Sequence, residues 1–437
     1  MKNSEINKYP KYKPSGIEWM GEIPSDWKLE RTKWIYSESR ERNRELNYNE
    51  EDLLSVSEYY GVAKRNEKID NNDLLNRAES LSENMKVRKG ELVINIMLAW
   101  KKGLGTSNYE GIVSPSYCVY RLINGGYHPK YFHYLYRTDE YAETFRRFSR
   151  GIIDSRLRLY SEEFFNTLTL IPPPAEQTAI ANYLDDKTEK IDTLIEKKKK
   201  LIELYKEERI AVINQAVTRG INPNVKLKPS GIDWLGDIPE HWEVKKLKYV
   251  GNIKYGLGQP PRQLDTGLPL IRATNIERGR INEKDLIFVD PDDVPFDRDP
   301  VLKENDIIIV RSGAYTADSA IIPKKYEGAI TGYDMVFRVY NDNPFFISYI
   351  LLSNYLLVNQ LYLQRLRAAQ PHLNKEELGE AFLLMPKKIE QDQVVQYIET
   401  ETKRIDDTIT KIGKEIELLS EYRTALISEV VTGKIKV

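Results

Sequence analysis

The sequence comprises 437 residues, of which 41% are hydrophobic and 30% charged, and its formal net charge is −1. These proportions are typical of a folded protein, and no apolar run approaches the roughly 20 residues of a membrane-spanning helix, which argues against a membrane protein. A net charge near zero also argues, for the chain as a whole, against nucleic-acid binding.

The N-terminal segment and the cysteine content bear on the cellular compartment. The opening residues MKNSEINKYPKYKPSG are polar and lack the apolar region of a signal peptide. Cys118 is the one cysteine, so no internal disulfide can form. A reduced, cytoplasmic location is therefore predicted.

A phrase near the start of the chain is repeated about half a chain length later. Residues 13–27 read KPSGIEWMGEIPSDW and residues 228–242 read KPSGIDWLGDIPEHW. A period this long indicates a duplicated domain, because solenoid repeats run only about 20 to 50 residues. Each copy contains two tryptophans, which we interpret as packing anchors where a domain meets a helix: Trp19 and Trp27 in the first, Trp234 and Trp242 in the second.

The region after each phrase diverges between the copies and has a mixed α/β pattern. Apolar, strand-like runs such as ELVINIML (91–98) and DIIIVRSGAY (306–315) are followed by turn signals. Tyrosine-rich helical patterns come next, at 128–138 and 343–357. A constant frame with variable middles favours a chain that presents two different surfaces on one scaffold.

Each copy ends in a long helical pattern. After IPPPAEQ (171–177) and after MPKKIEQ (385–391), apolar residues recur at alternating steps of three and four. Such a pattern, sustained over about five heptads, is typical of a coiled coil. The predicted organisation is a globular domain over 1–170, a helix over 171–220, a second globular domain over 221–384 and a second helix over 385–437. The fold class is α/β (α+β) for the two domain copies, with an internal pseudo-twofold repeat.

Two basic segments fall at matching places in the two copies. Residues 146–160 read RRFSRGIIDSRLRLY and residues 361–373 read LYLQRLRAAQPHL. Asp154 is the one acidic residue in the first segment, and the second segment contains none. Equivalent basic patches predict two equivalent contacts with a polyanion. Either segment alone could instead be a solvated loop. The occurrence of both at matching places favours contact with a polyanion.

The sequence offers little catalytic chemistry. The histidines His128, His133, His241 and His372 lack metal-ligand spacing, and the phosphate-binding pattern GxxxxGK[ST] is missing. The element IPPP (171–174) lacks the polar and aromatic residues of an amino-methyltransferase motif. The acids of VDPDDVPFD (289–297) have no lysine at nuclease spacing. The pattern indicates a recognition protein whose chemistry is done by other chains.

Three segments together resemble the specificity subunit of type I restriction-modification systems. They are SGIDWLGDIPEHWEVKKLK (230–248), AAQPHLNKEEL leading to IEQ (368–391) and ALISEVVTGKI (425–435). The resemblance covers essentially the whole chain, in the order target recognition domain, helix, target recognition domain, helix. The first copy departs from the pattern at residues 151–159, where GIIDSRLRL replaces the alanine-alanine-glutamine-proline form.

The resemblance implies a non-catalytic subunit that reads double-stranded DNA. Each recognition domain would contact one half of a split target, and the two long helices would form an antiparallel coiled coil that sets the distance between the halves. The helices would also dock two modification (methyltransferase) subunits, which methylate adenine with S-adenosylmethionine, and two restriction subunits would complete the complex. No cofactor is expected on this chain; S-adenosylmethionine, ATP and Mg are expected on its partners.

The candidate DNA contacts are basic and polar residues of the variable middles. Lys and Arg would bind phosphates, whereas Arg, Gln and His would reach base edges. The candidates are Lys101, Lys102, Arg150, Arg156 and Arg158 in the first domain, and Arg262, Arg311, Arg367, Gln370 and His372 in the second. For Arg311 the alternative is an ion pair with Asp334. Two other classes of function stay open, a coiled-coil scaffold that binds only proteins and a stand-alone DNA-modifying enzyme.

Overall fold

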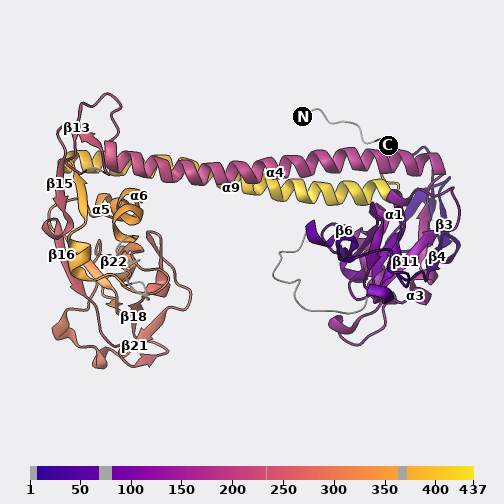
Figure 1. Ribbon diagram of the computed structural model, residues 1–437, viewed down its shortest axis with the longest axis horizontal. Coiled ribbons are helices and arrows are strands. Elements are labelled where there is room, and N and C mark those ends of the chain that lie inside the picture. The colour runs from indigo at the N-terminus through magenta and orange to yellow at the C-terminus, as the bar shows by residue number, and fades with distance from the viewer. Residues whose placement is uncertain (1–6, 68–80, 233, 363–371) are drawn as a thin grey trace. The chain divides into compact units, whose positions relative to one another are not determined.

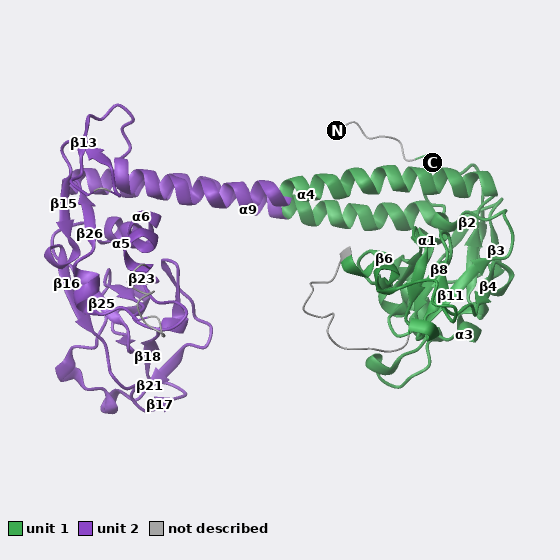
Figure 2. Cartoon of the chain, in the orientation of Figure 1, with its two compact units in different colours: residues 1–198, 414–437 green, residues 199–413 purple. Residues whose placement is uncertain are grey.

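The computed structural model describes residues 7–67, 81–232, 234–362 and 372–437. The chain divides into two compact units, shown in separate colours in Figure 2. Unit 1 comprises residues 1–198 and 414–437, and unit 2 comprises residues 199–413. Each long helix contributes one part to each unit, and the units are described in turn.

Unit 1 is built on a four-stranded antiparallel sheet covered by short helices (Figure 1). The sheet order is β4 (Tyr36–Ser39), β11 (Tyr117–Leu122), β8 (Leu92–Asn95) and β9 (Leu104–Thr106). Four antiparallel pairs surround it: β1 (Tyr12–Pro14) with β2 (Glu22–Pro24), β3 (Lys28–Arg31) with β12 (Leu168–Ile171), β5 (Leu54–Ser57) with β6 (Gly61–Lys64), and β7 (Met85–Val87) with β10 (Gly111–Val113). The helices are α1 (Pro129–Tyr136), α2 (Asp139–Phe148) and α3 (Ser161–Asn166).

Unit 2 repeats the main sheet and two of the four strand pairs of this arrangement. Its main sheet has the order β16 (Gly251–Tyr255), β25 (Met335–Val339), β22 (Ile307–Ile309) and β23 (Ser319–Ile321). The pairs β13 (Leu227–Pro229) with β14 (Asp237–Pro239) and β15 (Glu243–Lys246) with β26 (Phe382–Met385) match β1–β2 and β3–β12. The helical elements are α5 (Pro344–Leu352), α6 (Asn354–Leu356), a π-helix over Leu357–Leu361 and α8 (Lys375–Gly379).

Unit 2 also contains strands that lie outside its main sheet. They form a second four-stranded sheet and a short hairpin: β17 (Gln263–Leu264), β21 (Ile287–Val289), β18 (Leu268–Ile271) and β24 (Ile330–Thr331) in that order, and β19 (Ile276–Glu277) with β20 (Arg280–Ile281). The predicted mixed α/β class is confirmed. The frame of the two units is shared, and the strands between its elements differ.

The repeated tryptophans explain why the phrase occurs twice. Trp27 is fully buried and its Nε1 donates a hydrogen bond to Oε2 of Glu176, 2.9 Å away. Trp242 is equally buried and donates to Oε1 of Glu390 at 3.0 Å. Both glutamates lie in the first turn of a long helix. The predicted role as packing anchors is therefore confirmed for these two tryptophans, whereas Trp234 is 46% exposed and stacks on a tyrosine.

The glutamine after each of these glutamates fastens the start of the long helix to its domain. Oε1 of Gln177 accepts the amide of His128 at 2.9 Å, and Nε2 donates to the carbonyl of Pro172 at 2.8 Å. Gln391 accepts the amide of Asn343 at 2.8 Å and donates to the carbonyl of Pro386 at 2.9 Å. Buried amide side chains need such partners, because an unpaired one costs about 1 to 3 kcal/mol.

The long helices are α4 (Pro174–Arg219) and α9 (Lys388–Val431), with 46 and 44 residues. Within unit 1, Asp192 of α4 pairs with Arg423 of α9 at 2.9 Å. Within unit 2, Arg209 of α4 pairs with Asp406 of α9 at 3.2 Å. The two ion pairs use the same two repeat positions with their roles exchanged between the helices. Among the residues described, no helix combines the length and apolar composition that crossing a membrane requires.

Candidate nucleic-acid interface

In unit 2 the basic and aromatic side chains converge just beyond β22. Arg311 follows that strand, and its Cζ lies 4.4 Å from the ring centroid of Tyr255 and 4.4 Å from that of Tyr333. Tyr255 ends β16 and Tyr333 lies just before β25, so both rings come from strands of the same sheet. We call Tyr255 and Tyr333 the tyrosine clamp.

A glycine next to Tyr255 lets the two segments of the clamp approach each other. A Cβ on Gly256 would lie 2.0 Å from the carbonyl oxygen of Gly332, so these segments approach each other too closely for any side chain. The hydroxyl of Tyr255 is fixed as well, because it accepts the backbone amide of Lys375 at 2.9 Å. The positions of the rings are therefore set by the backbone and by the start of α8.

The carboxylate of Asp334 holds the backbone of Arg311 in place. Its Oδ1 accepts the backbone amide of Arg311 at 3.1 Å, and the amide of Ala273 also contributes a hydrogen bond. Burial disfavours the charged form and raises the pKa of Asp334 to about 6. The contact of Asp334 with Arg311 thus runs through the main chain, not through the ion pair that the sequence left as an alternative.

The other candidates of unit 2 have different surroundings. His372 pairs with Ser312 in an antiparallel bridge, next to the hydrogen bond from the amide of Leu373 to the carbonyl of Arg311 at 2.8 Å. Arg262 is exposed, and its guanidinium forms an ion pair with Asp290, which follows β21. Arg367 and Gln370 lie outside the described residues.

The equivalent position in unit 1 carries a different side chain on the same backbone frame. There the amide of Leu159 donates to the carbonyl of Ile96 at 2.9 Å, just as Leu373 donates to Arg311 in unit 2. Ile96 follows β8, the counterpart of β22. An aliphatic residue thus replaces the clamped arginine.

Unit 1 has its own cationic cluster nearby, on Trp100. The Nζ of Lys101 lies 5.0 Å from the Trp100 ring centroid, and Cζ of Arg146 lies 5.5 Å from it. Lys102 forms an ion pair with Asp139 at 2.7 Å. Lys101 therefore presents an exposed charge beside an indole, whereas the charge of Lys102 is largely matched.

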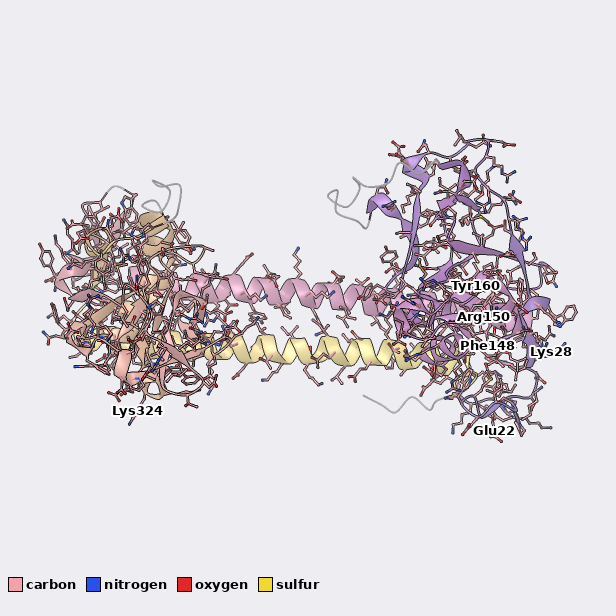
Figure 3. The ribbon with its side chains drawn as sticks, turned by 90° about the horizontal axis from the view of Figure 1, so that it is seen from below. Glu22, Lys28, Phe148, Arg150, Tyr160 and Lys324 are labelled. Atoms are coloured by element: carbon pink, nitrogen blue, oxygen red, sulfur yellow. The ribbon has the colours of Figure 1, made fainter. Side chains whose placement is uncertain are left out.

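The three arginines after α2 form one short loop. Arg150 and Arg158 exchange two backbone hydrogen bonds of 2.9 Å, which close the loop. The guanidinium of Arg150, labelled in Figure 3, pairs with Glu162 at 3.1 Å and also with Glu163. Arg158 turns back to the carbonyl of Leu157 at 2.8 Å. Arg156 lies exposed in the turn over Asp154–Arg156.

Comparison with known proteins gives a consistent result. Residues 239–418 match the type I restriction modification DNA specificity domain. The EcoKI specificity subunit of Escherichia coli strain K12 is 23% identical over 305 residues, which is 67% of this chain and 62% of that protein. The MjaVIII specificity subunit of Methanocaldococcus jannaschii is 26% identical over 281 residues, 63% of either chain. The chain is therefore similar in sequence to type I specificity subunits, and residues 239–418 match their specificity domain.

Two solved structures share the fold of this chain. The HsdS subunit from Thermoanaerobacter tengcongensis superposes with a TM-score of 0.59 at 15% identity, over 94% of this chain and 98% of that one. A chain from a study of assembly of the type I restriction-modification system gives a TM-score of 0.67 at 14% identity, with the same coverage. In sequence, the chain aligns with 62% and 63% of the length of the EcoKI and MjaVIII subunits.

Sequence reasoning missed the residues that hold the site of each unit together. Tyr255 and Tyr333 were not among the candidates, although a tyrosine beside a glycine at a strand end, in KYGLG and TGYD, is a usable signal. Arg137 was missed too. It is half-buried after α1 and donates to backbone carbonyls, among them those of Lys102 and Leu104 at 2.7 and 2.8 Å. Burial lowers the pKa of Arg137 to about 10.

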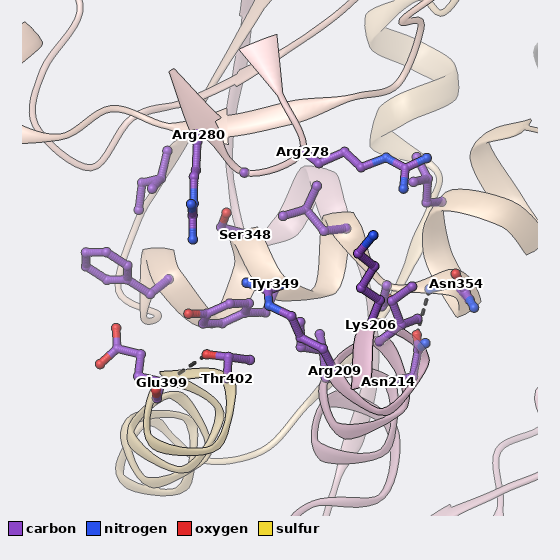
Figure 4. A pocket seen from close by; sticks show the side chains of 18 of the residues that line it. Lys206, Arg209, Asn214, Arg278, Arg280, Ser348, Tyr349, Asn354, Glu399 and Thr402 are labelled. Atoms are coloured by element: carbon purple, nitrogen blue, oxygen red, sulfur yellow. Dashed lines mark hydrogen bonds between the residues drawn. The ribbon is translucent and has the colours of Figure 1, made fainter. Parts of the chain in front are cut away.

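Unit 2 also contains a pocket of about 770 Å³ between α5 and the ends of its two long helices (Figure 4). Lys206 and Arg209 reach it from α4, and Arg278 and Arg280 reach it from the β19–β20 hairpin. Asp406 lies 3.2 Å from Arg209 and 3.9 Å from Arg280, so it offsets part of this charge. Within the described ranges, no group of three or more His, Cys, Asp or Glu side chains is placed to hold a metal ion.

Proposed function

We propose that this chain is the sequence-specific DNA-recognition subunit of a type I restriction-modification complex, in which each unit reads one half of a bipartite target. The observation that carries the proposal is the difference at equivalent strand ends. Arg311 in unit 2 and Ile96 in unit 1 occupy equivalent positions, and the carbonyl of each accepts an equivalent backbone hydrogen bond. A duplicated frame with different side chains at one place is what two readers of different sequences require.

The cations of each unit would divide into two roles. Exposed cations without an ion pair among the described residues, such as Lys101 and Arg156, suit phosphate oxygens, which fix register on the duplex. Residues held rigidly at the strand end, such as Arg311 and His372, suit base edges. Lys102, Arg150 and Arg262 would have to leave carboxylates before binding DNA, which costs part of the energy gained. For Arg367 and Gln370 base contact remains our proposal.

The domain plan and the partners form part of the same proposal. Target recognition domains over 1–170 and 221–384 would be joined by helices over 171–220 and 385–437 that pair as an antiparallel coiled coil. The reciprocal ion pairs of α4 and α9 within each unit support that pairing. Two modification subunits and two restriction subunits would supply catalysis in the cytoplasm, with S-adenosylmethionine, ATP and Mg, while this chain reads double-stranded DNA.

Reconstitution with the modification subunits tests this function. The complex should bind and methylate one bipartite motif, with an affinity that falls steeply as salt increases, because phosphate contacts release counterions. The chain alone should neither methylate nor cleave DNA. A complex without salt-sensitive DNA affinity would instead indicate a scaffold for proteins, and methylation by the isolated chain would indicate an enzyme.

A matched insertion in both long helices should lengthen the unread gap of the target. Adding four residues after Lys198 and four after Gly413 extends each helix by roughly 6 Å, about one to two base pairs. A four-residue insertion is a stutter, which coiled coils accommodate by local unwinding. Both half-sites should stay unchanged in the methylated motif. An altered half-site with the original gap would show that the helices do not set the spacing.

A further inference from the structure

The position of Arg311 is fixed by the frame that both units share. The carbonyl of Arg311 accepts the amide of Leu373 at 2.8 Å, and its own amide donates to Asp334 at 3.1 Å. The corresponding carbonyl in unit 1 belongs to Ile96. Backbone hydrogen bonds therefore hold this position whichever side chain it carries. The side chain can then differ between the units.

The guanidinium of Arg311 lies against two aromatic rings. The tyrosine clamp flanks its guanidinium at 4.4 Å from either ring centroid. Its Nε is buried and, among the described residues, has no hydrogen-bond partner. Arginine normally loses considerable rotamer freedom on binding, so a clamp that removes this freedom in advance favours a specific contact over a diffuse one.

Arg311 also has no ion pair among the described residues, in contrast to other arginines of unit 2. Arg262 pairs with Asp290, and Arg338 pairs with Asp306 at 2.7 Å, whereas no carboxylate in the described part of the chain forms an ion pair with Arg311. The rings offer cation–π contact with the guanidinium but no hydrogen-bond acceptor for its N–H groups. Within the described ranges, the N–H donors of this planar fork therefore have no acceptor.

We propose that Arg311, held by the tyrosine clamp, reads a guanine in the half-site that unit 2 recognises. The inference rests on the proposed function and deepens it. The guanidinium fork matches the O6 and N7 acceptors on the major-groove edge of guanine, which is the commonest specific contact of arginine with DNA. The tyrosines act as positioning residues that orient the fork.

The test uses the full chain assembled with its modification subunits and a DNA library randomised over the target. A domain exchange first identifies the half-site that unit 2 recognises. For the complex without substitutions we expect a guanine preference at one position of that half-site. Arg311→Ala should reduce that preference about 10-fold or more and leave the other positions unchanged, as expected for one lost base contact. Tyr333→Leu, at an exposed ring, should weaken the same position to a smaller degree, and Arg311→Lys should not restore it.

Lys324→Ala serves as the control, because it removes one exposed charge of unit 2 elsewhere (Figure 3). It should leave every position of the preference profile as it was. Equal weakening of all sequences by Arg311→Ala would make Arg311 a phosphate contact and overturn the inference, and so would an unchanged profile. If the complex without substitutions shows no sequence preference, the proposed function fails. That outcome differs from a failure of the inference about Arg311 alone.

Discussion

Replacing Trp242 with alanine is expected to lower the free energy of unfolding of unit 2 by about 3 to 5 kcal/mol. The indole is fully buried in the core that joins the domain to α4 and α9. Its removal leaves a cavity among well-packed side chains and takes away the hydrogen bond to Glu390. Hydrogen exchange of the amides of β15 and β26, which lie next to this core, measures the loss locally.

Trp234 offers a matched control within the same repeated phrase. It is 46% exposed, so Trp234→Ala should cost much less than Trp242→Ala, about 1 kcal/mol. Trp27→Ala should repeat the large effect in unit 1, since that indole makes the same bond to Glu176. Equal losses from Trp234 and Trp242 would contradict the assignment of one tryptophan of each phrase as the anchor.

Replacing Asp334 with asparagine is expected to stabilise unit 2 at neutral pH by about 2 to 3 kcal/mol. Burial raises the pKa of Asp334 from 3.8 to about 6, and a shift of about two pKa units corresponds to roughly 3 kcal/mol. Because the folded pKa is raised, the contribution of this carboxyl to stability is complete below pH 3.8 and is lost as the pH rises through 6. Asparagine keeps the acceptor for the amide of Arg311 without the charge.

The advantage of Asp334→Asn should therefore shrink as the pH falls from 6 towards 3.8. Exchange of the β22 and β25 amides, corrected for intrinsic rates, measures it at several pH values. Asp334→Ala provides the contrast, because it leaves the amide of Arg311 without its acceptor and should destabilise the unit by about 1 to 3 kcal/mol. A loss of stability for asparagine as large as for alanine would mean that the buried charge is net favourable.

Sequence periodicity predicted those parts of the fold that depend on residues close in the chain. The heptad pattern after each Glu-Gln pair predicted the long helices, and the repeated phrase predicted the buried pair Trp27 and Trp242. These signals are strong because a helix seam and a packing anchor each impose their residue type on a local pattern. The second sheet of unit 2 was not predicted, since its strands are two to four residues long.

The clamp around Arg311 shows why the site was harder to predict. Its tyrosines lie at positions 255 and 333 and meet only because β16 and β25 are neighbours in the sheet. The carboxylates that pair with Lys102 and Arg262 could not be foreseen either, because an ion pair between residues far apart in the chain has no spacing rule. Basic residues could be found from the sequence, but which of them are left without a carboxylate depends on tertiary structure.

The central claim is that two units on one frame read two half-sites independently, and a domain exchange tests it most directly. Residues 240–380 would be replaced by the matching region of a related specificity subunit, and the adenines methylated by the reconstituted complex would be mapped. The account predicts that one half of the bipartite motif changes while the other half and the gap persist. A change in both halves would contradict it, because the units would then be reading the target jointly.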